Sequence, residues 1–232
     1  MSHPIVDNDE WLAARRALLE KEKAFQKEQD ELARQRRELP WRKVEKNYTF
    51  EGVDGARTLA DLFGGSSQLI VYHFMFHPDW EEGCKACSFL TDGYNGTIAH
   101  LKARDTNLVA VSRAPLDKLL AYRERLGWSF PWYSSAGNDF NFDFGVSFTP
   151  EQLEAKDGNY NYRDGAAFGE EMPGMSVFLK ADDGTFLHTY STYARGLDPF
   201  IGTYRLLDIV PKGRDEDALP FTMAWVRRND EY

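Results

Sequence analysis

The chain has 232 residues, of which 42% are hydrophobic and 14% aromatic, enough to fill the core of one large domain. Its formal net charge of -9 argues against a nucleic-acid partner, because binding to phosphates requires a basic surface. No apolar run approaches the roughly 20 residues that cross a bilayer, and the first residues have no signal-peptide pattern, so we expect a cytoplasmic protein without a membrane partner.

Residues 7–39 are predicted to form one long helix. Asp7 is a suitable N-cap, strong helix formers follow it, and Pro40 gives a stop. An apolar stripe recurs every seven residues, but charged residues such as Lys21 and Glu28 hold the second apolar position of the heptads. We therefore expect a helix that lies on its own domain or on a partner subunit, and a homodimer through this helix is one hypothesis. The stripe consists of Trp11, Leu18, Phe25, Leu32 and Leu39.

An alternation of strands and helices follows. Residues 48–63 suggest a strand, a turn and a short helix. Residues 69–76 form a continuous apolar run rich in β-formers, which predicts a central strand buried on both faces. A three-and-four apolar spacing over residues 87–101 predicts a helix, residues 107–112 the next buried strand, and residues 116–126 another helix. Such crossovers build parallel sheet, so the fold class is α/β.

The second half of the chain is less regular. Residues 128–171 are aromatic and rich in Gly, Asn and Asp, and are interpreted as an insertion. Residues 176–190 predict a β-hairpin, with a helix near residues 197–207. Residues 211–232 form a charged tail whose apolar interval, residues 219–226, is expected to pack on the body or a partner. Within the insertion, an alternating strand or a packed loop is suggested by Phe140, Phe142, Phe144 and Phe148.

The chemistry is expected at Cys84 and Cys87, the only cysteines of the sequence. They form a Cys-x-x-Cys at a predicted helix start, beyond the carboxyl end of the central strand, where α/β proteins gather reactive groups. A helix start favours negative charge and lowers the pKa of the first thiol from about 8.5 to roughly 3.5–7.5. Cys84 is therefore predicted to be the nucleophile and Cys87, one turn later, the resolving thiol. Lys85 either favours the thiolate or is simply solvated.

Neighbouring residues leave alternatives open. Zinc would need four ligands, with His77 and either His73 or Asp79 joining the cysteines, and we expect no metal and no cofactor. His77 either assists proton transfer or ends the strand, and Trp80 either packs or forms a rim on which a substrate docks. Pro173 precedes the hairpin, where a cis proline would face the thiols and offer backbone to a substrate, or it is an ordinary pre-strand proline.

Several motifs resemble those of known families. The layout from residue 48 to Cys87, with Pro173 before SVFLKADDG, is similar to thioredoxin-like and peroxiredoxin-like proteins. More closely, long motifs over nearly the whole chain resemble the domain of unknown function 899 family, which is described as predicted dithiol-disulfide oxidoreductases. These motifs are LPW at 39–41, YHFMF.PDW..GC..CSF at 72–89, VSRAPL at 111–116, GW.FPW.SS..NDFN.DF at 127–144, PG.SVF at 173–178 and HTYSTYARG at 188–196.

The resemblance implies a thioredoxin-like three-layer α/β/α sandwich with an added N-terminal helix and a C-terminal extension. Residues 1–40 are then a helical extension and residues 41–210 the thioredoxin-like domain, which includes the insertion at about 128–171. Residues 211–232 remain as a tail. The peroxiredoxin pattern Pro-x-x-x-Thr-x-x-Cys is not met, since counting back from Cys84 places His77 at the Pro position and Glu81 at the Thr position.

Three functions follow from these observations. The first is a thiol-disulfide oxidoreductase whose partners are a thiol or disulfide substrate or a reductant protein. The second is a peroxiredoxin-like thiol peroxidase, and the third a non-enzymatic binding or assembly module with inert or metal-bound cysteines. Arg113 and Arg195 follow predicted strands, and each either binds an anionic substrate or peroxide or forms an ordinary ion pair.

Overall fold

The computed structural model describes residues 3–232 and divides at Pro40 into two compact units. The first unit is dominated by helix α1 (Asn8–Arg37), which confirms the predicted long helix. The Asp7 carboxylate accepts hydrogen bonds from the backbone N–H groups of Asp9 and Glu10, at 3.0 and 2.9 Å. No residue of α1 is buried, and the apolar stripe that includes Phe25 is about half exposed.

Deleting the residues before Leu39 is expected to leave the stability of the remaining chain nearly unchanged. Because α1 belongs to a compact unit separate from the one that contains the sheet, its loss should shift the melting temperature by less than about 3 °C, as surface changes of about 0.5 kcal/mol do. Scanning calorimetry of the full and shortened chains measures this shift. A fall of more than about 10 °C would show that the helix covers an apolar surface of the other unit.

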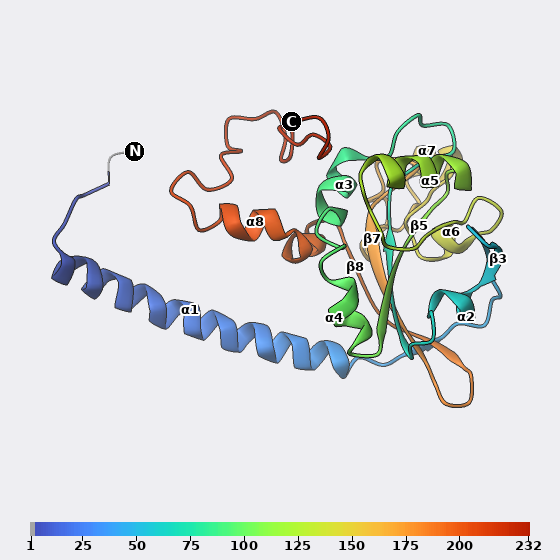
Figure 1. Ribbon diagram of the computed structural model, residues 1–232, viewed down its shortest axis with the longest axis horizontal. Coiled ribbons are helices and arrows are strands. Elements are labelled where there is room, and N and C mark those ends of the chain that lie inside the picture. The colour runs from blue at the N-terminus through green and yellow to red at the C-terminus, as the bar shows by residue number, and fades with distance from the viewer. Residues whose placement is uncertain (1–2) are drawn as a thin grey trace. The chain divides into compact units, whose positions relative to one another are not determined.

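The second unit is built on an eight-stranded sheet, counted over the described residues, in the order β1-β8-β7-β4-β5-β6-β2-β3 (Figure 1). The central strand β4 pairs in parallel with β5 and antiparallel with β7, while β7 and β8 form the predicted antiparallel hairpin. The order β5-β4-β7-β8 with these directions is the thioredoxin-like arrangement. The strands are β1 (Arg42–Lys43), β2 (Thr49–Gly52), β3 (Gly55–Thr58), β4 (Gln68–His73), β5 (Thr106–Ser112), β6 (Trp132–Ser134), β7 (Gly174–Lys180) and β8 (Phe186–Tyr193).

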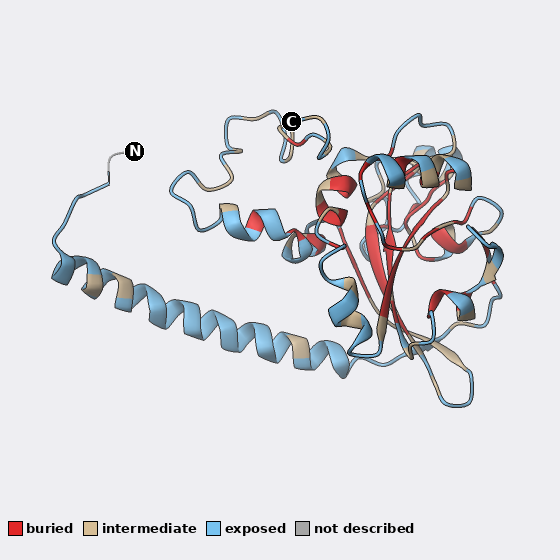
Figure 2. Ribbon diagram, in the orientation of Figure 1, coloured by how far each residue is buried: buried red, intermediate tan, exposed pale blue. Residues whose placement is uncertain are grey.

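Helices cover both faces of this sheet, which makes the unit a three-layer α/β/α sandwich. Alternation along β4 places Leu69 and Val71 in one core and Tyr72 in the other, so both faces of the strand are buried (Figure 2). None of the described helices is both long and apolar enough to span a membrane. The remaining helices are α2 (Leu59–Leu62), α3 (Lys85–Thr91), α4 (Ile98–Lys102), α5 (Leu116–Arg125), α6 (Phe140–Asp143), α7 (Pro150–Ala155), the 3-10 helix η1 (Ala194–Phe200) and α8 (Gly202–Leu207).

Two predicted elements near the cysteines are shorter than expected. The central strand ends at His73 rather than Phe76, because its partner β5 ends at Ser112, but the apolar run continues as buried backbone whose Met75 carbonyl accepts the N–H of Cys84. The predicted helix over residues 87–101 is two helices, α3 and α4. The glycines at 93 and 96 lie in the turns between them, where their conformational freedom weakens a continuous helix.

The aromatic insertion also differs from its prediction. Phe140 is the first residue of the short helix α6, and Phe144 is its C-cap. The two side chains point the same way because residues four apart lie on one face of a helix, not because the segment is an alternating strand. Strand β6 and helix α7 were not predicted, although Thr149 forms a capping box with Gln152 at the start of α7. In the tail, Val226 is fully buried, so this segment packs on the body of its own unit.

Candidate functional site

Cys84 and Cys87 lie where the chain turns from the segment after β4 into helix α3. Cys84 is the N-cap of α3, and its N–H donates to the Met75 carbonyl at 3.0 Å. The loop reaches this position only because residue 83 is glycine: a Cβ there would lie 2.6 Å from the ring of Phe74. The close approach of Gly83 to the aromatic core therefore fixes where helix α3 begins and where the Cys84 thiol lies.

The two thiols form a hydrogen bond to each other but differ in burial. Cys84 is partly exposed, whereas Cys87 is 2% exposed, and neither is in a disulfide. The hydrogen bond from Cys87 is the main cause that lowers the pKa of the Cys84 thiol; burial acts against it, and the backbone N–H groups of Cys87 and Ala86 lower the pKa further. Burial, together with the proximity of Cys84, raises the pKa of the Cys87 thiol well above its ordinary value. The pair thus consists of a partly exposed thiol with a lowered pKa and a buried thiol with a raised pKa.

Tyr72 supports the buried thiol from the sheet. Its side chain forms a hydrogen bond with Cys87, and burial raises the pKa of the Tyr72 phenol well above its usual range. Tyr72 packs edge-to-face on Tyr94, with ring centroids 5.8 Å apart. The phenol therefore stays neutral and holds the Cys87 thiol in place without adding charge.

Arg228, in the C-terminal tail, is a further residue of the site. Its guanidinium donates to the Tyr122 hydroxyl at 2.7 Å and to the Gly83 carbonyl at 3.1 Å, and forms an ion pair with Glu82 at 2.8 Å. Its positive charge also lowers the pKa of the Cys84 thiol. Sequence reasoning missed Arg228 because no local pattern links it to a cysteine so far away in the chain.

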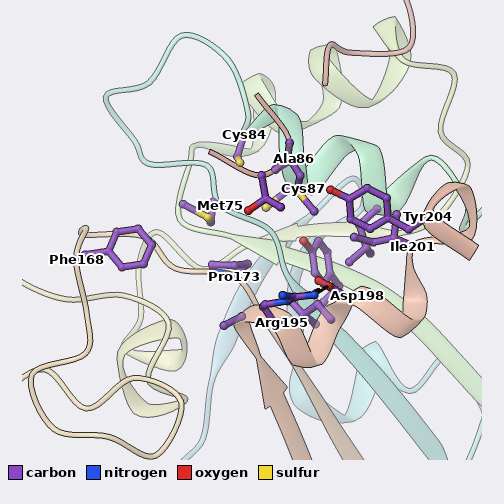
Figure 3. Close-up of a pocket in the computed structure, with 16 residues that line it drawn as sticks. Met75, Cys84, Ala86, Cys87, Phe168, Pro173, Arg195, Asp198, Ile201 and Tyr204 are labelled. Carbon is purple, nitrogen blue, oxygen red and sulfur yellow. Dashed lines mark hydrogen bonds and ion pairs between the residues drawn. The ribbon is translucent and has the colours of Figure 1, made fainter. Parts of the chain in front are cut away.

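A cavity of about 320 Å³ opens beside the thiols (Figure 3). Pro173 lines it opposite Cys84 and Cys87, so the structure brings these three predicted residues together. All peptide bonds of the described residues are trans, which corrects the expectation of a cis bond before Pro173. The lining is largely apolar: Tyr72, Met75, Cys84, Ala86, Cys87, Leu90, Phe168, Pro173, Ala194, Arg195, Leu197, Asp198, Ile201, Tyr204, Thr222 and Met223.

Four other predicted residues do not line this cavity. His77 packs near Trp80, with ring centroids 6.2 Å apart, and its Nε2 lies 3.3 Å from a Glu170 carboxylate oxygen. Lys85 is exposed at the first position of α3. Arg113 forms a 2.8 Å ion pair with the buried Glu171, as the ion-pair interpretation expected. The substrate-binding interpretation of Arg113 loses its support, since the guanidinium is already paired.

The described residues offer no group of three His, Cys, Asp or Glu side chains that could hold a metal ion. His73, one of the ligands considered for zinc, is buried, and its Nε2 lies 2.9 Å from the Ser176 hydroxyl. Burial lowers the pKa of His73 to about 3, so it is a neutral core histidine.

Comparisons with known proteins give one family and several distant structures. A family model described as "Bacterial protein of unknown function (DUF899)" matches residues 1–232, and no curated protein matches the chain. A mutant of peroxiredoxin Q from Xanthomonas campestris is similar at 11% identity and a TM-score of 0.46, over 68% of this chain and 90% of that chain. The peroxidoxin BcpB from Mycobacterium tuberculosis is similar at 15% identity and a TM-score of 0.46, over 72% and 96%. The mitochondrial 2-Cys peroxiredoxin from Plasmodium falciparum is similar at 13% identity and a TM-score of 0.44, over 74% and 95%.

Proposed function

The chain belongs to the family described as bacterial protein of unknown function (DUF899), and because that description names no reaction, we propose a function from the site itself: thiol-disulfide exchange by the Cys84–Cys87 pair. The observation that carries the proposal is that the two hydrogen-bonded thiols differ in exposure and in pKa. Cys84 is partly exposed with a lowered pKa, and Cys87 is buried with a raised pKa. The first is suited to attack a substrate and the second to act only afterwards.

The proposed cycle balances within the pair. The Cys84 thiolate attacks one sulfur of a substrate disulfide, the substrate S–S bond breaks, and one substrate thiolate leaves. The departed substrate thiolate takes the proton of Cys87, and the Cys87 sulfur attacks the Cys84 sulfur of the mixed disulfide, which forms the Cys84–Cys87 disulfide and releases the second substrate thiolate. The enzyme dithiol has lost two electrons and two protons, and the substrate has become two thiols. A dithiol reductant, either a small molecule or a protein, returns the pair to the reduced form.

The surroundings support these steps. Arg228 favours the Cys84 thiolate by its charge, and Pro173 forms the opposite wall of the cavity in which the substrate lies. A cytoplasmic location is part of the proposal, because glutathione and thioredoxin systems there keep such a pair reduced and ready to attack. A homodimer through α1 remains a separate proposal, which is based on its exposed apolar stripe.

A thiol peroxidase is the second candidate, and the lowered pKa of Cys84 is the observation in its favour. In that reaction the thiolate attacks the peroxide O–O bond to give a sulfenic acid and water or an alcohol. Cys87 then forms the disulfide and releases water. The pairing of Arg113 with Glu171 counts against it, because a free guanidinium is the group that would polarise the peroxide.

Alkylation of the reduced protein with iodoacetamide across pH 4 to 10, followed by peptide mass spectrometry, tests the proposal. The Cys84 rate is expected to reach half its maximum below the pH of about 8.5 typical of a free thiol, while Cys87 reacts only after unfolding. Oxidised dithiothreitol should then convert the native pair to an intramolecular disulfide. Two thiols that both titrate near 8.5 and resist oxidation would favour the non-enzymatic module, and rapid turnover of hydrogen peroxide in the presence of a thiol would favour the peroxidase.

A further inference from the structure

The cavity beside the thiols is built for an apolar group rather than for a folded protein. Its volume of about 320 Å³ falls at the lower end of the range of roughly 300–1,000 Å³ that small-molecule pockets occupy. Met75, Leu90 and Ile201 give it apolar walls, and Pro173 adds another. A site of this size and chemistry takes a single ring or a short branched chain.

Two segments distant in the sequence contribute lining residues to this cavity. Phe168, from the segment between α7 and β7, lies at its edge and is 83% exposed as a residue. Thr222 and Met223, from the tail, line it as well, and Met223 also packs against the main core. An apolar group bound in the cavity would cover part of this ring and remove apolar surface from water.

Charge at the cavity is limited to one ion pair among its lining residues. Arg195 donates to the Asp198 carboxylate at 3.1 Å, and Asp198 also lies 3.6 Å from a guanidinium nitrogen of Arg214. Figure 3 shows Arg195 and Asp198 on the side of the cavity opposite the cysteines. These two side chains form an ion pair with each other on that side, with the Arg195 guanidinium exposed to solvent, while the surface beside the thiols is apolar.

We propose that this cavity is a substrate subsite that selects small disulfides carrying an apolar substituent, such as a benzyl or branched alkyl group, over polar small disulfides and protein disulfides. The inference rests on the proposed function, since it assumes that Cys84 attacks a disulfide. The apolar substituent lies between Pro173 and the walls of the cavity and brings its own sulfur to Cys84. Filling such a pocket discriminates between substrates by about 10- to 200-fold for each methylene-sized difference.

The test compares three substrates by their rate of oxidising the reduced protein in a single turnover, followed by acid quench and mass spectrometry. Benzyl 2-hydroxyethyl disulfide is expected to react at least about tenfold faster than bis(2-hydroxyethyl) disulfide, and insulin more slowly than either. Equal rates for the two small disulfides, or a faster reaction with insulin, would overturn the subsite and leave the proposed function standing. Failure of all three to oxidise Cys84 would instead refute the proposed function.

A pair of tail variants tests the location of the subsite. Thr222→Trp places a large ring at an exposed position that lines the cavity, and Phe221→Trp places the same ring on its exposed neighbour, which does not. Thr222→Trp should reduce the preference for the benzyl disulfide over the hydroxyethyl disulfide at least about fivefold, whereas Phe221→Trp should leave it unchanged. Near-ultraviolet circular dichroism confirms that both variants are folded. An unchanged preference in a folded Thr222→Trp variant would contradict the assignment.

Discussion

Replacing Cys84 by Ser is expected to abolish disulfide reduction, with a loss of at least about a thousandfold, to the rate without protein. A serine hydroxyl is not ionised at neutral pH, and the hydrogen bond from Cys87 that favours the Cys84 thiolate cannot make an alkoxide of it. The remaining thiol, Cys87, cannot substitute for the nucleophile, since it is buried and its pKa is raised. Turnover of bis(2-hydroxyethyl) disulfide with dithiothreitol as reductant measures the loss.

Two variants of the second cysteine serve as controls for this result. Cys87→Ser keeps a hydrogen-bond donor beside Cys84 and should stop the cycle after one equivalent of leaving thiol, with a mixed disulfide on Cys84 visible by mass spectrometry. Cys87→Ala removes the donor, so the pH at which Cys84 is half alkylated should rise relative to the Ser variant. Full turnover in the Cys84→Ser variant, or a mixed disulfide on residue 87, would reverse the assigned roles.

The second large effect is expected from Arg113→Met, which breaks a buried ion pair and is expected to cost about 3–5 kcal/mol of unfolding free energy at pH 8. Glu171 is 2% exposed, and its two carboxylate oxygens are bonded to Arg113 and to the Ser147 hydroxyl, at 2.8 and 2.9 Å. Without the guanidinium, an ionised Glu171 is a buried charge with one remaining hydrogen bond. Urea unfolding at pH 5 and pH 8 measures the cost.

The protonation of Glu171 decides whether the stability of the folded protein rises or falls with pH. Burial raises its pKa to about 7 from an ordinary value of 4.5, although Arg113 acts in the opposite direction. The folded state therefore holds this proton more tightly than the unfolded state, and stability falls as pH rises from 4.5 through about 7. Removing Arg113 raises the pKa of Glu171 further, so the variant should lose much less stability at pH 5 than at pH 8.

A double variant separates charge from packing. In Arg113→Met with Glu171→Gln, the neutral amide keeps a hydrogen-bond partner in Ser147, and the loss at pH 8 should be largely recovered. Equal destabilisation of the single variant at both pH values would contradict the electrostatic account. It would point instead to the lost stacking of Arg113 on Phe142, whose ring centroid lies 4.6 Å from the guanidinium carbon.

The parts of the fold that sequence reasoning found are those with local signals. The apolar run before His77 indicates a strand buried on both faces, and the turn at residues 182–184 indicates a hairpin. Both structures depend on residues within a few positions of each other in the chain. The alternating phenylalanines led to the wrong prediction of a strand. Phe140 and Phe144 fit both the two-residue period of a strand and the four-residue spacing of a helix. Arg228 was beyond such reasoning because its position depends on how the tail packs.

The tail also affects when the site becomes complete during synthesis. Gly83 and Arg228 are 145 positions apart, which corresponds to roughly 7–29 s of translation at about 5–20 residues per second. During that interval the nascent chain carries both cysteines without the arginine that favours the thiolate. The contribution of Arg228 to the lowered pKa of the Cys84 thiol is therefore absent until the tail has been made and has packed against Gly83, whereas the larger contribution, from Cys87, depends only on a residue three positions away.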